Sequence, residues 1–185
     1  MADSLSKVCR LINAVGVFEG TTKLHKVAYV AQVLGYPILE HFEWYTHGPY
    51  SPSLALKLNQ LIAAGLVKRT QTKTGKYTTH RYALTAAGRE FMDLVGGGTE
   101  FDDRLKKLVT ELHQKRRGRD MELIDSILYW EGQGLTRQEA VDTVVSIKPK
   151  FAGRRAEIEQ ALEDMRVLEE HYSASNGDRS PAGAS

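Results

Sequence analysis

The sequence contains very little cysteine and little proline. Its 185 residues include 1 Cys and 5 Pro, with 42% hydrophobic and 26% charged residues. The single cysteine, Cys9, excludes an internal disulfide and is typical of a protein from a reducing compartment. Because Cys9 lies in an amphipathic helical pattern, we expect a buried and inert thiol there. The ordinary hydrophobic content favours a folded globular chain over a disordered one.

Long apolar runs and catalytic signatures are also missing from the sequence. No segment approaches the roughly 18 consecutive apolar residues of a membrane helix, and the N-terminal stretch lacks the apolar core of a signal peptide. We therefore expect a cytoplasmic protein with no membrane partner. Neither a phosphate-binding glycine loop nor a nucleophile elbow is present, so we expect no enzymatic activity and no cofactor.

Acidic residues are absent from one long window of the chain. No Asp or Glu occurs between Glu43 and Glu90, and all seven charged residues of this window are basic. These residues are Lys57, Lys68, Arg69, Lys73, Lys76, Arg81 and Arg89. Subtracting these seven charges from the net charge of +2 leaves −5 for the rest of the chain. Such polarisation is expected where one face binds a polyanion, the alternative being a solvated surface with acids nearby in space.

Hydrophobic periodicity in the first half predicts helices and one β-hairpin. Apolar residues recur at helical spacing over residues 3–15, 22–34, 52–64 and 86–95. We expect Thr21 or Thr22 to cap the second helix and Thr85 the fourth. Ser51 and Pro52 begin the third, because a serine hydroxyl accepts a free amide and proline fits the first helical position. The aromatic alternating run 38–46 predicts a short strand, and residues 66–85 predict a two-stranded hairpin.

Three consecutive glycines at 96–98 mark the predicted boundary between two regions. The prediction is a domain over residues 1–95, an all-helical region over 99–172, and a disordered tail over 173–185 that has too few apolar residues to fold. Helices are expected over residues 99–114, 120–131, 136–147 and 155–172. The apolar stripe of the last helix either packs internally or forms a homodimer with a second copy.

The order of elements in residues 1–95 is helix, helix, helix, hairpin and helix, which is the order of a winged helix-turn-helix module. In such a module the third helix fits the DNA major groove and wing cations contact phosphates. The fold class is therefore predicted as mainly α with a small β-hairpin. We predict duplex DNA contacts from helix 51–64 and the wing 66–85. The predicted contact residues are Tyr50, Ser51, Ser53, Lys57, Gln60, Lys68, Arg69, Lys73, Lys76 and Arg81.

Two stretches of the sequence resemble known families. The stretch GLVKRTQTKTGKYTTHRYALTAAGREF resembles the wing and following helix of MarR and PadR type regulators, with their Gly-Leu-Val, basic hairpin and Tyr-x-Leu-Thr-x-x-Gly ending. The stretches KLHKVAYVAQVLGYP and FEWYTHGPYSPSLALKLNQLIAAGLV are similar to YwgA-like bacterial proteins, and more loosely to the Panacea antitoxin domain. In both, a Lys-Leu-x-Lys-x-x-Tyr helix precedes an aromatic strand and a Gly-Pro step. The resemblance covers residues 23–93 and implies the winged-helix fold.

Two functions from different classes remain open at this point. The first is a winged-helix DNA-binding protein that regulates transcription. The groove face of its third helix offers Lys57 but no arginine for a bidentate guanine contact, so wing cations would supply mostly sequence-neutral affinity. The second, implied by the Panacea resemblance, is a protein-binding module that neutralises a toxin or docks on another protein without entering a groove.

A metal site on the aromatic strand is the less favoured interpretation of its histidines. His41, Glu43 and His47 fall on one face of the predicted strand. Strand residues two apart are separated by only about 6.5 to 7 Å, but His41 and His47 lie much further apart than one site spans. Because a metal needs three or four converging ligands, we expect a polar strand face and no metal.

Overall fold

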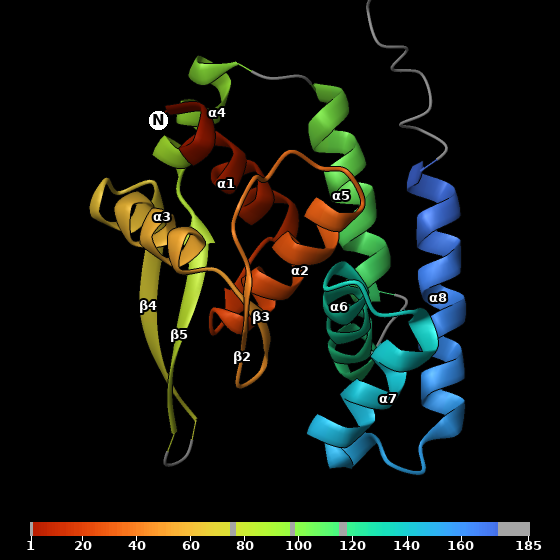
Figure 1. Ribbon diagram of the computed structural model, residues 1–185. Coiled ribbons are helices and arrows are strands. Elements are labelled where there is room, and N and C mark those ends of the chain that lie inside the picture. The colour runs from red at the N-terminus through yellow and green to blue at the C-terminus, as the bar shows by residue number, and fades with distance from the viewer. Residues whose placement is uncertain (1, 75–76, 97–98, 115–117, 174–185) are drawn as a thin grey trace, which may run out of the picture.

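The computed structural model describes residues 2–74, 77–96, 99–114 and 118–173 (Figure 1). Residues 174–185, predicted as a disordered tail, and Lys76, a predicted contact, lie outside the described residues. The helices are α1 (Ala2–Val15), α2 (Thr22–Val33), α3 (Pro52–Ala63), α4 (Ala86–Val95), α5 (Thr99–Gln114), α6 (Gly118–Gly132), α7 (Arg137–Ile147) and α8 (Arg155–Ser173). The strands are β1 (Phe18–Glu19), β2 (Glu43–Tyr45), β3 (Gly48–Tyr50), β4 (Val67–Thr74) and β5 (Tyr77–Leu84), and η1 (Pro149–Phe151) is a short 3-10 helix.

The predicted fold class, mainly α with a small β-hairpin, is confirmed. Each predicted helix appears within two residues of its expected ends, because their periodicity and caps are local signals. Ser51 caps α3, and Thr136 and Glu139 form a complete capping box at the start of α7. The sequence pattern missed β1, β3 and η1, which are each only two or three residues long. Short elements of this kind depend on partners elsewhere in the chain.

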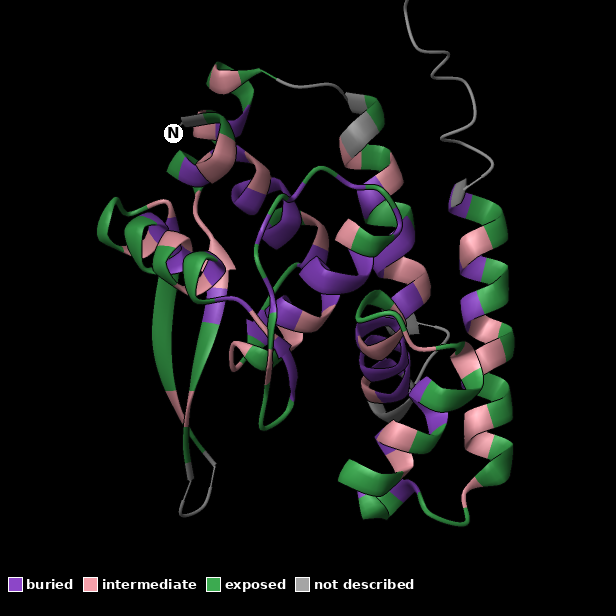
Figure 2. Cartoon of the chain, viewed as in Figure 1, coloured by how far each residue is buried: buried purple, intermediate pink, exposed green. Residues whose placement is uncertain are grey.

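The hairpin belongs to a three-stranded antiparallel sheet with the order β1-β5-β4. Strand β1 adds to the edge of β5, where Phe18 lies opposite Tyr82 and their rings stack with centroids 5.2 Å apart. Val67 and Tyr82 are buried at the base of the hairpin, whereas its outer half is mostly exposed (Figure 2). The sheet is thus anchored at one end, and the other end of the hairpin projects from the body (Figure 1).

The start of α4 is fixed to the base of the hairpin. The Thr85 side-chain oxygen accepts a hydrogen bond from the Gly88 amide at 3.0 Å and caps α4. The same hydroxyl lies 3.0 Å from the Leu66 carbonyl oxygen, to which it donates. The Thr-x-x-Gly ending of the predicted wing therefore has a structural role, because it joins the hairpin to the following helix.

One cluster of buried apolar side chains includes residues from both predicted regions. Helix α6 packs against α2, α7 and α8, and α5 packs against α1 (Figure 1). The α8 stripe is buried within the same chain, since Ala161, Met165 and Leu168 are at most 1% exposed. A homodimer through this helix remains a prediction, and it would have to use the outer face of α8. Among the described helices, none combines the length and apolar character needed to cross a bilayer.

Cys9 lies inside this cluster with no exposed surface. Burial raises the pKa of its thiol to about 11, because the thiolate would lose its hydration. Its position and pKa agree with the sequence expectation of an inert thiol.

Candidate nucleic-acid interface

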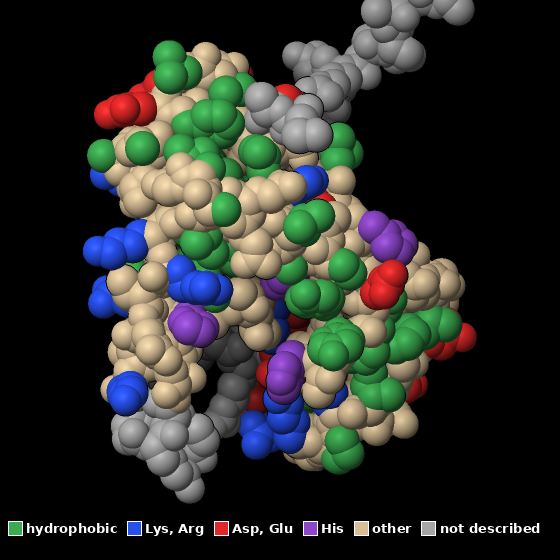
Figure 3. Space-filling model, turned by 90° about the vertical axis from the view of Figure 1, so that its left-hand side faces the viewer, with side chains coloured by type: hydrophobic (Ala, Val, Ile, Leu, Met, Phe, Trp, Pro, Cys, Tyr) green, Lys and Arg blue, Asp and Glu red, His purple; other side chains and the backbone are tan. Residues whose placement is uncertain are grey.

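The hairpin carries exposed basic side chains that are not neutralised by ion pairs. Lys68, Arg69, Lys73 and Arg81 are all exposed, and none of them is in an ion pair within the described part of the chain. Figure 3 shows Lys and Arg side chains along the hairpin at one edge of this face. The positive charge predicted from the acid-free window is therefore available at the surface.

The strand register distributes these cations over both faces of the hairpin. Arg69 lies opposite Tyr82 and Lys73 opposite Thr78, which places both basic side chains on one face. Lys68 and Arg81 fall on the other face, because side chains alternate along each strand. A ribbon with cations on both sides can meet phosphates of both DNA strands when it lies beside a groove.

Ser51 does not reach the surface. It is fully buried, and its side-chain oxygen accepts the Leu54 amide at 3.2 Å as the cap of α3. Its own amide donates to Nδ1 of His25 at 3.1 Å. The expectation of a direct DNA contact from Ser51 is therefore corrected, because capping and contact with a surface ligand compete for the same side chain. Ser51 fixes the start and direction of α3.

A buried glutamate engages two of the predicted contact residues on α3. Glu40 has a side chain only 1% exposed, and its carboxylate accepts hydrogen bonds from Ser53 and from the ammonium of Lys57. The Glu40 backbone is itself held by Gln32, whose amide nitrogen donates to the Glu40 carbonyl at 2.9 Å. The Lys57 charge is thus neutralised inside the protein. This contact could not be inferred from charge composition, because Glu40 lies before the acid-free window and 17 residues from Lys57.

The outer face of α3 consequently presents uncharged side chains, some polar and some apolar. Leu56 is 59% exposed, and Asn59 and Gln60 are also exposed. Tyr50, at the start of this segment, is half-buried between two rings, with its centroid 4.4 Å from that of His25 and 5.5 Å from that of Tyr45. Of the predicted α3 contacts, Gln60 is the one whose side chain remains exposed and unpaired within the described residues.

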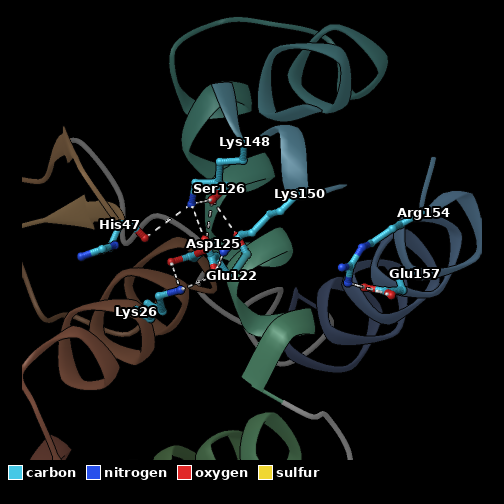
Figure 4. A network of polar contacts seen from close by, with 9 residues as sticks. All are labelled: Lys26, His47, Glu122, Asp125, Ser126, Lys148, Lys150, Arg154 and Glu157. Atoms are coloured by element: carbon cyan, nitrogen blue, oxygen red, sulfur yellow. Dashed lines mark hydrogen bonds and ion pairs between the residues drawn. The ribbon is translucent and has the colours of Figure 1, made fainter. Parts of the chain in front are cut away.

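A largely buried network of charges lies where α2 meets α6 (Figure 4). Lys26 of α2 places its Nζ 3.7 Å from Oδ2 of Asp125, a carboxylate with no exposed surface. From the opposite side, the Lys148 ammonium donates to Glu122 Oε1 at 3.1 Å and to Ser126 Oγ at 3.0 Å. It also lies 3.4 Å from the His47 carbonyl oxygen. The network therefore joins α2, the β2–β3 turn, α6 and the segment after α7.

The Lys-Leu-x-Lys-x-x-Tyr pattern noted in the sequence provides part of this connection. Its second lysine is Lys26, and its tyrosine is Tyr29, whose hydroxyl donates to the Leu128 carbonyl oxygen at 3.2 Å. Both side chains point from α2 to α6. The pattern therefore marks the contact between α2 and α6. The sequence alone does not reveal that contact, because the partners of Lys26 and Tyr29 lie about a hundred residues further along the chain.

Asp125 gives the protein a testable dependence of stability on pH. Burial raises the pKa of Asp125 to about 7, against the opposing effect of Lys26 and Lys148. The folded state thus binds a proton that the unfolded state releases near pH 4, so this group lowers stability as pH rises from about 4 to 7. Asp125→Asn removes that titration. Its stability relative to the wild type is expected to rise by up to about 1.4 kcal/mol per pH unit in this range.

Urea unfolding of both proteins at several pH values measures this difference directly. Glu90→Gln is a suitable control, because Glu90 is an exposed residue of α4 outside the network. A difference between Asp125→Asn and the wild type that stays constant from pH 4 to 7 would show that Asp125 does not titrate there.

Gly48 makes the closest approach of the Gly-Pro step to α6. Its φ of +121° is unfavourable for any residue with a Cβ, and a Cβ at this position would lie 3.1 Å from Oδ2 of Asp125. We expect Gly48→Ala to lower the free energy of unfolding by about 2 to 3 kcal/mol, from backbone strain plus displacement of the carboxylate. Thermal unfolding of Gly48→Ala, compared with that of Gly132→Ala, tests this. At Gly132 a new Cβ would meet only Tyr29 Oη, at 3.4 Å. Equal stability of the two variants would contradict it.

The part of the chain that the structure describes holds no converging metal ligands. Within the described residues, no group of three or more His, Cys, Asp or Glu side chains is arranged to hold a metal ion. His41 Nε2 lies 3.6 Å from Glu43 Oε1, and both side chains are largely exposed.

The fold and surface define a mainly α protein with a projecting, basic β-hairpin. No family model matches the chain. The chain is 29% identical over 165 residues to the Bacillus subtilis (strain 168) protein named "Uncharacterized protein YwgA", covering 89% of this chain and 96% of that protein. This supports the YwgA-like resemblance drawn from residues 23–93. It also extends the similarity into the C-terminal helices, for which the sequence had suggested no relative.

Proposed function

We propose that this protein is a winged-helix protein that binds duplex DNA and regulates transcription. The observation that carries the proposal is the hairpin β4–β5, which projects from the body and bears on both faces cations that form no ion pair with any described residue. DNA phosphates are a suitable partner for these cations. Because the hairpin projects, its side chains can reach the DNA backbone without any change in the packed core.

The arrangement of elements supports the same proposal. Helices α1, α2 and α3 precede the hairpin, and β1 lies between α1 and α2 and pairs with β5. Helix α3 is joined to β4 by a short connection and contacts it, so the helix and the hairpin lie beside one another (Figure 1). A duplex placed along this side can therefore contact both elements.

The affinity should come mainly from phosphates. With Lys57 neutralised by Glu40, α3 presents Gln60 as a hydrogen-bonding residue and Leu56 as an apolar one. A glutamine can bond adenine and an aliphatic side chain can contact a thymine methyl group, but neither contact alone gives strong specificity. We therefore expect tight discrimination to require further contacts or a preference for bent DNA.

Binding of a random-sequence duplex at two salt concentrations tests the proposal. If four hairpin cations each displace a counterion, log affinity should fall with log salt with a slope of about −4. Affinity should then drop roughly 150- to 250-fold between about 50 mM and about 200 mM salt. If no duplex binding were detected at the lower salt concentration, the DNA-binding proposal would be contradicted.

Protein binding is the second candidate, favoured by Leu56. This side chain is 59% exposed on the outer face of α3, between residues whose polar groups are occupied inside the protein. An exposed leucine at such a place suits the centre of a protein contact. The variant Leu56→Arg separates the candidates. It should tighten duplex binding if α3 faces DNA, because it adds a cation there, and unchanged duplex affinity would favour a protein partner.

A further inference from the structure

A cavity of about 170 Å³ lies at the N-terminus of α2 and shares Tyr50 with the predicted DNA contacts. The first turn of α2 forms one wall, with Thr21, Thr22 and His25. The β2–β3 hairpin forms the other, with residues 45 and 47–50. The walls therefore combine the free end of a helix with aromatic rings and an imidazole.

The helix end at this cavity has donors that no side chain caps. Thr21 is the N-cap residue of α2, but its φ of −87° and ψ of −19° are helical and its side chain makes no capping bond. The sequence expectation that Thr21 or Thr22 caps this helix is therefore wrong. The first amides of a helix have no partner within the helix, and the helix dipole adds partial positive charge at this end. No acidic residue lies in the first turn of α2 to offset it.

His25 supplies an independent donor in the same wall. Its side chain is 2% exposed, and Nδ1 accepts the Ser51 amide at 3.1 Å. Burial lowers its pKa to about 4, so the ring is neutral near pH 7 and Nε2 must carry the single proton. Within the described residues this Nε2 has no hydrogen-bond partner. A buried N–H without an acceptor is unfavourable, and an acceptor supplied by a ligand would remove that cost.

The cavity lies next to the pairing of β1 with β5. Strand β1 leads into α2, and the Gly20 amide between them donates to the His80 carbonyl oxygen of β5 at 2.9 Å. Glu19 of β1 lies opposite Arg81 of β5. Arg81 follows His80 on that strand and is exposed. A ligand here would meet amide, hydroxyl and imidazole donors. Such a set matches a compact oxyanion and not a cation.

We propose that this cavity binds an oxyanion of the phosphate type. The first amides of α2, the hydroxyls of Thr21 and Thr22 and Nε2–H of His25 donate to its oxygens, and the rings of the β2–β3 hairpin enclose it. The same chemistry is offered by a free phosphate group and by a phosphate of the DNA backbone. The proposal does not depend on DNA binding, because it concerns an anion that can be tested alone.

Thr21→Asp tests the site with a variant that should fold well. An aspartate at the N-cap accepts the free amides and complements the helix dipole, so the phosphate-free Tm should rise. Its carboxylate also occupies and repels the anion position. Thr136→Asp is the matched control, since it makes the same charge change at the N-cap of α7, which Thr136 already caps.

Titration of wild type and both variants with inorganic phosphate, against chloride at equal ionic strength, gives the readout. We expect phosphate to raise the Tm of the wild type and of Thr136→Asp and to shift the amide signals of residues 22–25. In Thr21→Asp both responses should be lost, with affinity at least ten-fold weaker. An unresponsive wild type, or a Thr21→Asp variant that responds like the wild type, overturns free-phosphate binding.

Duplex binding by the same proteins identifies the source of the phosphate. If Thr21→Asp weakens duplex binding at least ten-fold relative to Thr136→Asp, the site holds a DNA phosphate. If the two variants bind duplex equally and only the free-phosphate response is lost, the site holds a separate small anion. If neither phosphate nor duplex distinguishes Thr21→Asp from Thr136→Asp, the cavity is not an oxyanion site.

Discussion

Replacing Gly88 by alanine is expected to lower the free energy of unfolding by about 3 kcal/mol. A Cβ at this position would lie 2.3 Å from the Leu66 carbonyl oxygen and 2.7 Å from Cδ1 of Leu84. The first of these atoms belongs to the backbone at the base of the hairpin and cannot rotate away. Helix α4 would have to move, which would break the hydrogen bond from Thr85 to Leu66. Alanine's better helix propensity, about 1 kcal/mol, does not offset this clash.

Urea unfolding of Gly88→Ala beside Gly132→Ala measures the effect. Gly132 is also helical, but a Cβ there would meet only the Tyr29 hydroxyl, at 3.4 Å, so that variant should be close to the wild type. If Gly88→Ala were as stable as Gly132→Ala, the close contact between α4 and the hairpin would be contradicted.

Reversing two charges on the hairpin is expected to abolish most duplex binding. Arg69→Glu with Lys73→Glu removes two cations from one face of β4 and places two carboxylates there. Each lost phosphate contact should reduce the salt slope by about 1, so the slope should become shallower by about 2. Repulsion by the new carboxylates should reduce affinity further, to a total of at least about a hundred-fold at moderate salt.

A control with the same change in net charge separates a local effect from a general one. Lys106→Glu with Lys107→Glu alters two exposed residues of α5, which lies away from the hairpin (Figure 1). We expect this variant to keep most of its duplex affinity, in a fluorescence anisotropy titration at constant salt. An equal loss in both double variants would mean that only the overall charge matters.

Local signals made much of the fold predictable. The start of α3 followed from Ser51 and Pro52, and the capping box of α7 from Thr136 and Glu139, since each depends on residues a few positions apart. Strand β1 could not be predicted in the same way. It exists because Phe18 stacks on Tyr82, a residue far along the chain.

The candidate interface was predictable only in part, for the same reason. Charge composition located the hairpin cations, because an acid-free window is visible in the sequence. It could not show that Glu40 would neutralise Lys57, or that Gly48 would lie against Asp125, since those pairs come together only in the folded chain. The Gly-Pro step thus has two roles. It leads into α3, and Gly48 allows the turn to pack on α6.

The most direct test of the DNA-binding proposal is a map of backbone amide shifts when a random-sequence duplex is added to the labelled protein at low salt. The proposal predicts that the affected amides belong to β4, β5 and the outer face of α3, with α7 and α8 unchanged, and that added salt reverses the shifts. Shifts confined to α7 and α8, or no shifts at a salt concentration where the hairpin cations are unscreened, would contradict it.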